Sequence, residues 1–271
     1  MHELVDSSGR KVVIPEEPKR IISFSPAVTE ILFELGLESR IVGISAFCAR
    51  PKGTEKIRKV GSYGSARMDL IRELRPDLIL TISGFQGKFA EKLSREFPVY
   101  TFELPSSVAG IIDLVSRVGI VTGRIPEARY MEFELLKSIG SLRRRPHITG
   151  YLEIDLGGPT SFGSLSYITD ALAILGIESI YHNIYGEWIQ PDLDYVKSAD
   201  PDVIFYEPKM YSRFTESNLS DLLEKRGWSN MRSVSRGNVF VTPGSLDFFA
   251  HHGPSFIREV LPWVMERIET V

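Results

Sequence analysis

The chain has too few of the residues on which several classes of protein depend. Its single cysteine, Cys48, excludes an internal disulfide and any zinc or iron–sulfur centre that needs several cysteine ligands. No apolar run approaches the roughly 18 residues of a transmembrane helix. The formal net charge is −3 and Arg143–Arg145 is the only basic run, so the sequence has no electrostatic footprint for nucleic acid. Because that run stands before Pro146, we expect it to end a helix.

Sequence motifs of common catalytic sites are also missing. The glycines at 61–64 and 157–158 lack the full pattern of a phosphate-binding loop, and no Gly-x-Ser-x-Gly nucleophile elbow occurs. The adjacent residues His251 and His252 would point to opposite sides of a strand, and no other histidine stands at helical spacing from them. We therefore expect no metal site, a polar role in a pocket or loop for this pair, and a protein without catalysis. An enzyme acting in a cleft between two lobes is the contrasting hypothesis.

Length and composition are those of an ordinary globular protein. With 271 residues, of which 43% are hydrophobic and 25% charged, the chain can form one large domain or two of common size. Met1 and His2 lead almost at once into strand-like sequence, without the charged and apolar regions of an export leader. The protein is therefore expected either to be cytoplasmic or to have lost a leader that preceded residue 1.

Two segments of the chain repeat one pattern, and the acids that open them, Asp69 and Asp194, are 125 positions apart (194 − 69). In each segment the acid precedes a short amphipathic helical stretch, a Pro-Asp pair follows, and an apolar strand comes next. One repeat at this separation indicates two similar lobes rather than a solenoid, and two lobes imply a cleft. Either acid alone is explained by helix capping, whereas their matched positions also fit a surface shared with a partner.

Short apolar strands alternate with helices in both halves of the chain. This alternation predicts an α/β fold in which each lobe has a parallel central sheet covered on both faces. After a hairpin over 5–14, strands are expected over 20–24, 41–44, 78–82, 99–102, 148–154, 179–182, 203–206 and 239–242. Helices are expected over 27–35, 69–74, 88–97, 166–175, 193–199, 217–226 and 254–267.

The stretch over 106–145 keeps a helical pattern that Gly119, Gly123 and Pro126 interrupt. One irregular helix, or two in succession, would fit it. The predicted organisation is an N-terminal lobe over 1–105, a connecting backbone helix over 106–145, and a C-terminal lobe over 146–271.

Aromatic residues in the expected loops are the strongest indication of a ligand. Tyr63 and Trp188 each stand a few residues before the repeated helix of their lobe, and Phe248 and Phe249 follow Asp247 in the loop before the last helix. Loops at the carboxyl ends of parallel strands are where α/β folds bind ligands. The alternative is that these rings pack as core, although the equivalent placement of Tyr63 and Trp188 favours the cleft for those two.

Several segments together resemble the helical-backbone (class III) substrate-binding proteins of ATP-binding-cassette (ABC) importers. The resemblance covers nearly the whole chain and is carried by the segments 20–36, 41–44, 60–64, 69–80 and 162–205. That family serves importers of cobalamin, ferric siderophores and haem. The resemblance implies two Rossmann-like α/β lobes joined by a long rigid helix, with a ligand cleft between the lobes.

The resemblance also implies roles for individual residues. Asp69 and Asp194 match the acids that dock against arginines of the membrane permease. Tyr63 stands where cobalamin-binding members carry an aromatic residue, usually a larger indole, and Trp188 matches a tryptophan. Asp247 matches an acid near the cobalamin. His251 stands where the family usually has an arginine. Further expected ligand contacts are Gly84, Phe85 and Phe248.

A cobalamin-type corrinoid is the ligand that these matches favour. A ferric siderophore, met by arginines at 50, 67 and 213, is the runner-up, and haem is disfavoured because Tyr63 is offset by one from the expected axial ligand. The chelate is expected as cargo, without an intrinsic cofactor. The resemblance implies a monomer that is periplasmic or extracellular and membrane-associated, its export leader or lipid anchor being absent from this sequence. A cytoplasmic ligand carrier or sensor is the third hypothesis.

Overall fold

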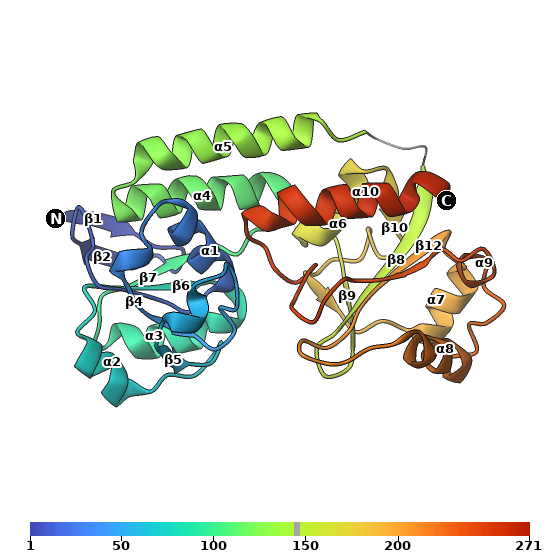
Figure 1. Ribbon diagram of the computed structural model, residues 1–271, viewed down its shortest axis with the longest axis horizontal. Coiled ribbons are helices and arrows are strands. Elements are labelled where there is room, and N and C mark those ends of the chain that lie inside the picture. The colour runs from blue at the N-terminus through green and yellow to red at the C-terminus, as the bar shows by residue number, and fades with distance from the viewer. Residues whose placement is uncertain (144–146) are drawn as a thin grey trace. The chain divides into compact units, whose positions relative to one another are not determined.

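The computed structural model describes residues 1–143 and 147–271, apart from the side chain of Thr270 (Figure 1). Arg144, Arg145 and Pro146, where a helix was expected to end, lie outside the described residues. The chain forms two compact units, one of Met1–Pro105 with Ala109–Lys137, the other of Ser106–Val108 with Ser138–Val271. Within the ranges that the structure describes, no helix is both long and apolar enough to span a membrane.

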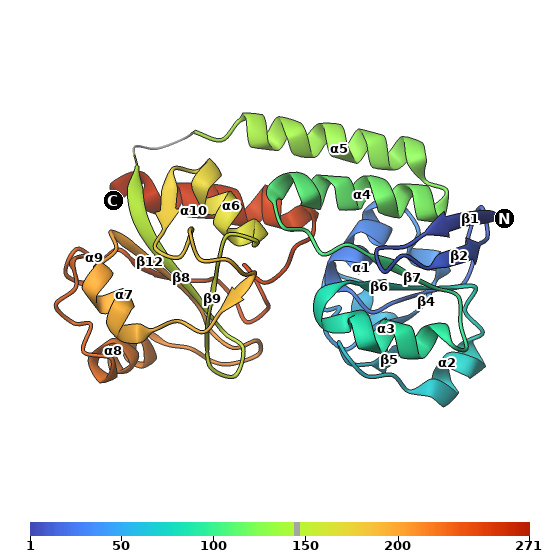
Figure 2. The same ribbon diagram turned by 180° about the vertical axis from the view of Figure 1, so that it is seen from behind.

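The first unit is built on a five-stranded parallel sheet with the strand order β5-β4-β3-β6-β7. Its strands are β3 Ile21–Ser23, β4 Ile41–Ser45, β5 Lys59–Gly61, β6 Leu78–Ile82 and β7 Val99–Phe102. The sequence predicted all of them except β5, which begins with a lysine and ends with a glycine. The register places Ile22, Ile79 and Val99 in one row. Helices α2 (Met68–Leu74) and α3 (Gly87–Ser94) pack against this row and cover that face (Figure 2).

Helix α1 (Pro26–Glu34) follows β3 directly. The Ser25 hydroxyl caps it by accepting a hydrogen bond from the Val28 backbone N–H at 3.4 Å, and Pro26 occupies the first turn, where a missing N–H is harmless. Three short 3₁₀ turns complete the connections of this unit: Glu38–Arg40, Thr54–Lys56 and Gly84–Gln86.

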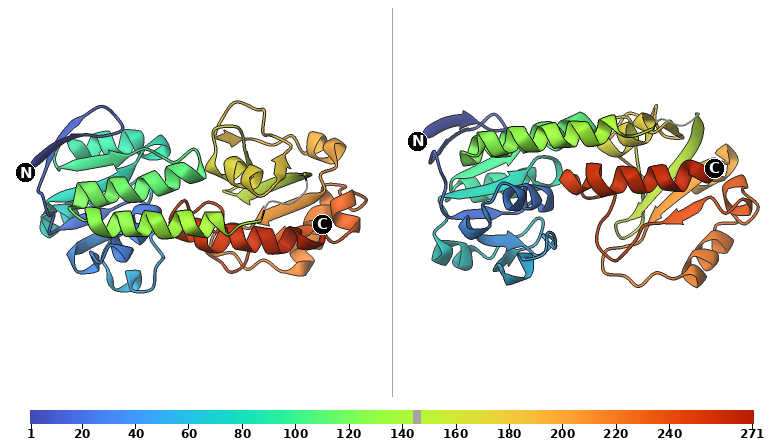
Figure 3. Two further views of the ribbon diagram at one scale, coloured as in Figure 1. Left: turned by 90° about the horizontal axis from the view of Figure 1, so that it is seen from above. Right: turned by 45° about the horizontal axis from the view of Figure 1, so that its top comes forward.

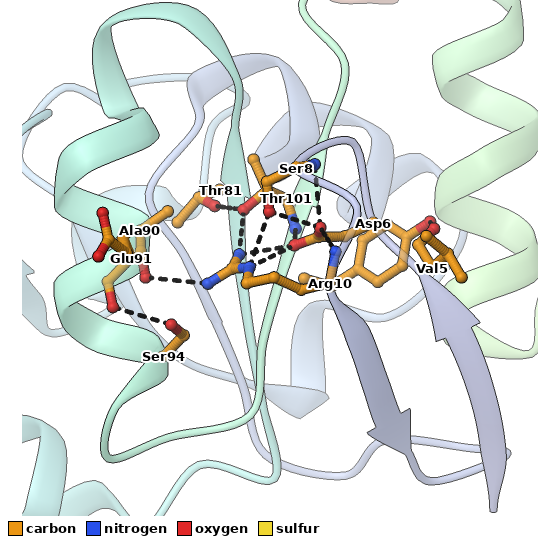
Figure 4. Close-up of polar contacts among 10 residues, drawn as sticks. Val5, Asp6, Ser8, Arg10, Thr81, Ala90, Glu91, Ser94 and Thr101 are labelled. Carbon is orange, nitrogen blue, oxygen red and sulfur yellow. Dashed lines mark hydrogen bonds and ion pairs between the residues drawn. The ribbon is translucent and has the colours of Figure 1, made fainter.

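The expected N-terminal hairpin consists of β1 (His2–Val5) and β2 (Lys11–Ile14), paired antiparallel. Its turn lies along the edge strand β7, because Ser7 donates its backbone N–H to the Thr101 carbonyl at 2.9 Å. Burial alone would raise the pKa of Asp6, but hydrogen bonds from Ser8 and Arg10 lower it overall. Arg10 also donates to the Thr101 hydroxyl at 2.9 Å (Figure 4). The hairpin therefore occupies hydrogen-bonding groups that an edge strand would otherwise expose.

Of the two arrangements considered for the helical stretch, the structure has two helices, α4 (Val108–Thr122) and α5 (Ile125–Gly140), which lie side by side (Figure 3). Gly123 adopts a left-handed φ of 71°, and a Cβ there would lie 2.4 Å from the Glu16 carbonyl oxygen. At Gly119 a Cβ would lie 2.3 Å from the Ala128 Cβ, so this glycine permits the close approach of α5.

The second unit has a six-stranded mixed sheet. Parallel strands β8 (Ile148–Asp155), β12 (Val203–Glu207) and β13 (Val239–Val241) form its centre, and β10 (Ile177–Ser179) pairs with β8. Two antiparallel strands, β9 (Pro159–Phe162) and β11 (Trp188–Ile189), extend one side. The strand expected over 179–182 is wrong: the strand ends at Ser179, whose carbonyl accepts the N–H of His182 in a turn. The adjacent residues Ile180 and Tyr181 in that turn have strand-like composition, which is why the sequence indicated a strand there.

Helices cover both faces of this sheet. Ile204 and Tyr151 face α7 (Leu193–Ala199) and α8 (Glu216–Lys225) in one core, while the ring of Phe205 lies 5.9 Å from that of Trp263 on the other side. The remaining helices are α6 Tyr167–Ile174, α9 Arg232–Ser235, a π-helical turn Phe256–Val260, α10 Leu261–Arg267 and a 3₁₀ turn Ile268–Thr270.

A buried ion pair attaches the end of α8 to β8. Arg226 donates two hydrogen bonds of 2.8 and 2.7 Å to Glu153, which is 1% exposed, and the Tyr151 hydroxyl donates a third at 2.6 Å. The guanidinium carbon lies 4.8 Å from the centroid of the Trp228 ring. Burial together with the Glu153 charge raises the pKa of Tyr151, which keeps its hydroxyl as a donor at neutral pH.

Candidate functional site

Three aromatic rings lie together beyond the carboxyl ends of three strands of the first unit. Phe47 follows β4, Tyr63 follows β5 and Phe85 follows β6. The Tyr63 ring centroid is 6.3 Å from that of Phe47 and 5.9 Å from that of Phe85. Phe85 is 74% exposed and Phe47 42%. We call these three residues the aromatic cluster; exposed rings of this kind are uncommon unless they bind something.

Two glycines shape the loops that carry this cluster. Gly84 has a φ of 74°, a left-handed conformation that lets the chain turn directly after β6. At Gly64 a Cβ would lie 3.0 Å from the Phe85 ring, so the absence of a side chain allows the ring to rest on the backbone. The structure therefore gives Gly84 a conformational role beside Phe85.

A buried amide, Gln86, joins the end of β6 to the segments that follow β3 and β5. Its Nε2 donates to the Tyr63 carbonyl at 2.7 Å and to the Phe24 carbonyl at 3.0 Å, while its Oε1 accepts the Ile82 N–H at 2.9 Å. The sequence analysis named Tyr63 and Phe85 but missed Phe47 and Gln86. Phe47 was recognisable as an aromatic residue just beyond a predicted strand, whereas Gln86 had no signal of its own.

In the second unit the exposed rings include those of Tyr185, 86% exposed, Tyr211, 61% exposed, and Trp188, 53% exposed. Trp188 was expected in a loop, but it lies on the two-residue edge strand β11, paired with Phe162, whose ring centroid is 6.4 Å away. Burial raises the pKa of Glu187, and a hydrogen bond with the Trp188 side chain opposes that rise. The sequence analysis missed Tyr185, three residues before Trp188.

The loop between β13 and the last helix contains Asp247, Phe248 and His251. Phe248 is only 7% exposed and its ring centroid is 5.3 Å from that of Trp263; Phe249 is 1% exposed. For these two phenylalanines the structure favours the core alternative over stacking on a ligand. Glu207, at the end of β12, accepts the backbone N–H groups of both phenylalanines, at 3.1 Å for Phe248.

The two adjacent histidines are both buried. His251 is 1% exposed, with Nδ1 3.8 Å from Asp247 Oδ2, a contact that becomes an ion pair only when the ring is protonated. His252 is 6% exposed and its ring lies 5.8 Å from that of Tyr167. In the part of the chain that the structure describes, no three His, Cys, Asp or Glu residues are placed to hold a metal ion.

The matched acids lie in the first turns of matched helices, Asp69 in α2 and Asp194 in α7. Neither is the capping residue: Asp192 caps α7 by accepting the Asp194 N–H at 3.0 Å, and α2 has no side-chain cap. Both acids are exposed, and the Asp69 side chain is fully so, although Arg72 donates to it at 2.8 Å. Capping therefore does not account for them, although both still complement the helix dipole.

The arginines considered for an anionic ligand are spread over both units. Arg50 is half-buried in the loop after β4, and Arg67 is exposed just before α2. Arg213 is exposed in the second unit, ahead of α8.

Comparison with known proteins identifies the family. A family model described as periplasmic binding protein matches residues 21–246, most of the chain and parts of both units. The chain belongs to the periplasmic binding protein family.

Two curated relatives of this periplasmic binding protein are similar over most of its length. An uncharacterised ABC transporter substrate-binding lipoprotein of Bacillus subtilis is 23% identical over 94% of this chain and 82% of its own. A cobalamin-binding protein of Halobacterium salinarum is 22% identical over 73% of this chain, which spans 56% of that protein's length.

Solved structures confirm the fold of this family member. A periplasmic solute-binding protein of Staphylococcus epidermidis has a TM-score of 0.77 at 22% identity, over 93% of this chain and 99% of its own. The vitamin B12-binding protein of Vibrio cholerae has a TM-score of 0.71 at 17% identity, over 93% and 97%. A haem-binding protein of Pseudomonas aeruginosa has a TM-score of 0.74 at 17% identity, over 92% and 91%. The prediction of a class III α/β fold with two lobes is therefore confirmed.

Proposed function

We propose that this chain is the extracytoplasmic substrate-binding component of an ABC importer and that it binds a bulky chelate, a cobalamin-type corrinoid, without catalysis. The observation that carries the proposal is the exposed aromatic cluster Phe47, Tyr63 and Phe85 at the carboxyl ends of a parallel sheet. The names of the relatives support it, since one is an ABC transporter substrate-binding lipoprotein and another a cobalamin-binding protein.

Aromatic surface is suited to a large planar ligand. A ring keeps little conformational freedom to lose on binding and offers a broad face for stacking. In the second unit, Tyr185 and Trp188 are exposed rings, and Asp247 would meet polar edge groups of the ligand, with the buried His251 ring 3.8 Å from its carboxylate. Phe248 has no direct part in this proposal because its ring packs against Trp263.

Delivery to a permease is the second half of the proposal. Asp69 and Asp194 stand at the same place in matched helices, one in each unit, and both are exposed. Carboxylates in such positions suit arginines of a membrane partner, where complementary charge sets orientation and association rate more than affinity.

Ferric-siderophore and haem binding are the alternatives within the same family. The exposed side chains of Arg67 and Arg213 would suit an anionic siderophore, and a structure of a haem-binding protein is similar in fold. All three tryptophans lie in the second unit, so their fluorescence reports ligand contact there. Titration with cyanocobalamin, a ferric hydroxamate siderophore and haemin should give saturable quenching with cyanocobalamin. Saturation by another of the three instead would replace the proposed ligand class.

A further inference from the structure

The backbone of the 247–250 loop is held by one buried carboxylate. Glu207 is 2% exposed, and it accepts the N–H of Phe248 at 3.1 Å as well as those of Phe249 and Ala250. The first bond goes to Oε1 and the second to Oε2. Consecutive backbone amides that converge in this way form an anion-binding nest, and here the anion is a side chain of the protein itself.

Neutral contacts hold the same loop from other elements. The Tyr167 hydroxyl of α6 donates to the Phe249 carbonyl at 2.7 Å, and the Phe249 ring centroid lies 6.1 Å from that of Trp263 in α10. These contacts fix the two phenylalanines. Asp247 and His251 flank the held amides, so the position of both depends on the same backbone.

The carboxylate is costly to bury. Burial, together with the nearby Asp247 charge, raises the pKa of Glu207 to about 7, although the backbone N–H donors act in the opposite direction. Other titratable groups on the elements packed around this loop and strand include Tyr151, Glu153 and Asp155 on β8, Tyr167 and Asp170 on α6, Tyr206 on β12, His251 and His252 on the loop, and Arg258 and Glu259 on the π-helical turn. A buried charge that opposes folding is typical of a residue that function requires. A glutamine at this position would offer one acceptor oxygen, whereas the Glu207 carboxylate offers two.

We propose that Glu207 is a positioning residue, whose carboxylate holds the 247–250 backbone so that Asp247 is presented to the ligand. The identity of the ligand in this inference rests on the proposed function, whereas the contact between Glu207 and the loop does not depend on it. Glu207→Gln should therefore weaken ligand binding while leaving the unit at least as stable. A merely structural role would lower both together.

The sign of the stability effect follows from linkage. The pKa of Glu207 in the folded chain is about 7, above the usual value of 4.5, so the folded state binds the proton more tightly than the unfolded state does. The folded state therefore loses stability as the pH rises from about 4.5 through about 7. Glu207→Gln removes this cost. The variant should therefore gain in urea midpoint relative to the wild type between pH 5 and pH 8, measured by tryptophan fluorescence, which reports this unit.

The decisive measurement is a pH titration of the wild-type amide signals of Phe248, Phe249 and Ala250 by nuclear magnetic resonance. They should shift together with a midpoint near 7, and in Glu207→Gln that transition should vanish and their hydrogen exchange accelerate by at least about tenfold. Glu178→Gln, at a residue whose side chain is 44% exposed, serves as the control and should behave as wild type. If the transition persists in Glu207→Gln, it does not arise from Glu207, and the inference is overturned.

Cyanocobalamin affinity at pH 8 should fall about tenfold in Glu207→Gln and stay unchanged in Glu178→Gln. If the wild type does not bind cyanocobalamin, the proposed function fails, while the amide signals still decide whether Glu207 holds the loop. Equal affinity in both variants together with a loosened loop would overturn the positioning role.

Discussion

Buried polar side chains at the ends of strands fix the loops that carry the candidate site. Gln86 joins the loops after three strands of the first unit, and Glu207 holds the last loop of the second. Sequence patterns indicate the exposed rings, since an aromatic residue beyond a strand stands out. They do not indicate the buried partners, because one polar residue after a strand has no periodicity. Only the three-dimensional contacts distinguish Gln86 from an ordinary loop glutamine.

Phe85→Ala should weaken cyanocobalamin binding about tenfold, or about 1.4 kcal/mol, because it removes the most exposed ring of the aromatic cluster. Phe133→Ala is the matched control, since Phe133 on α5 is 62% exposed against 74% for Phe85. Isothermal titration calorimetry measures both. Equal affinities for the two variants would remove Phe85 from the binding surface.

At the scale of elements, the short apolar runs predicted most strands and helices, because a parallel strand buried on both faces is apolar throughout. The misses have physical reasons. β9 and β11 are short antiparallel additions defined by pairing rather than by composition, and the pattern over 179–182 continued into a turn. Phe248 was placed correctly in its loop, but its neighbour Trp263 on α10 gives its ring a core role that spacing cannot show.

Arg226→Met should lower the free energy of unfolding of the second unit by about 3–5 kcal/mol, because it leaves the Glu153 carboxylate buried and unpaired. Arg232→Met is the control: Arg232 pairs with Asp200 but is 49% exposed, and its loss should cost under about 1 kcal/mol. Urea unfolding followed by tryptophan fluorescence compares them. A similar loss in both variants would contradict a special role for the buried pair.

At the scale of the whole molecule, the repeated segments have the same local structure in the two units. In each, the helix ends at a residue with a left-handed φ of 45°, Arg75 or Asp200. The aspartate of the following Pro-Asp pair then accepts backbone N–H groups where a neighbouring strand begins, Asp77 at β3 and Asp202 at β8. This part of the repeat is structural. The opening acid of each segment has no such structural role and is exposed.

The double variant Asp69→Ala/Asp194→Ala should bind cyanocobalamin as the wild type does but deliver it at least about tenfold more slowly, because docking loses a charge from each unit. Uptake into proteoliposomes that carry the protein's own permease measures delivery. Asp113→Ala/Asp221→Ala removes the same charge from other exposed helical sites, one in each unit, and should transport normally. Unchanged uptake by Asp69→Ala/Asp194→Ala would contradict the docking proposal.

The central claim is that exposed aromatic residues of this chain, Phe85 and Trp188 among them, bind a corrinoid. Its most direct test is calorimetric titration of cyanocobalamin into the wild type, Phe85→Ala, Trp188→Ala and the double variant, with the fold of each verified by circular dichroism. We predict one saturable site per chain, weaker binding in each single variant, and no measurable binding when both rings are removed. A wild type that shows no saturable binding, or a double variant that binds as tightly as the wild type, would contradict the account.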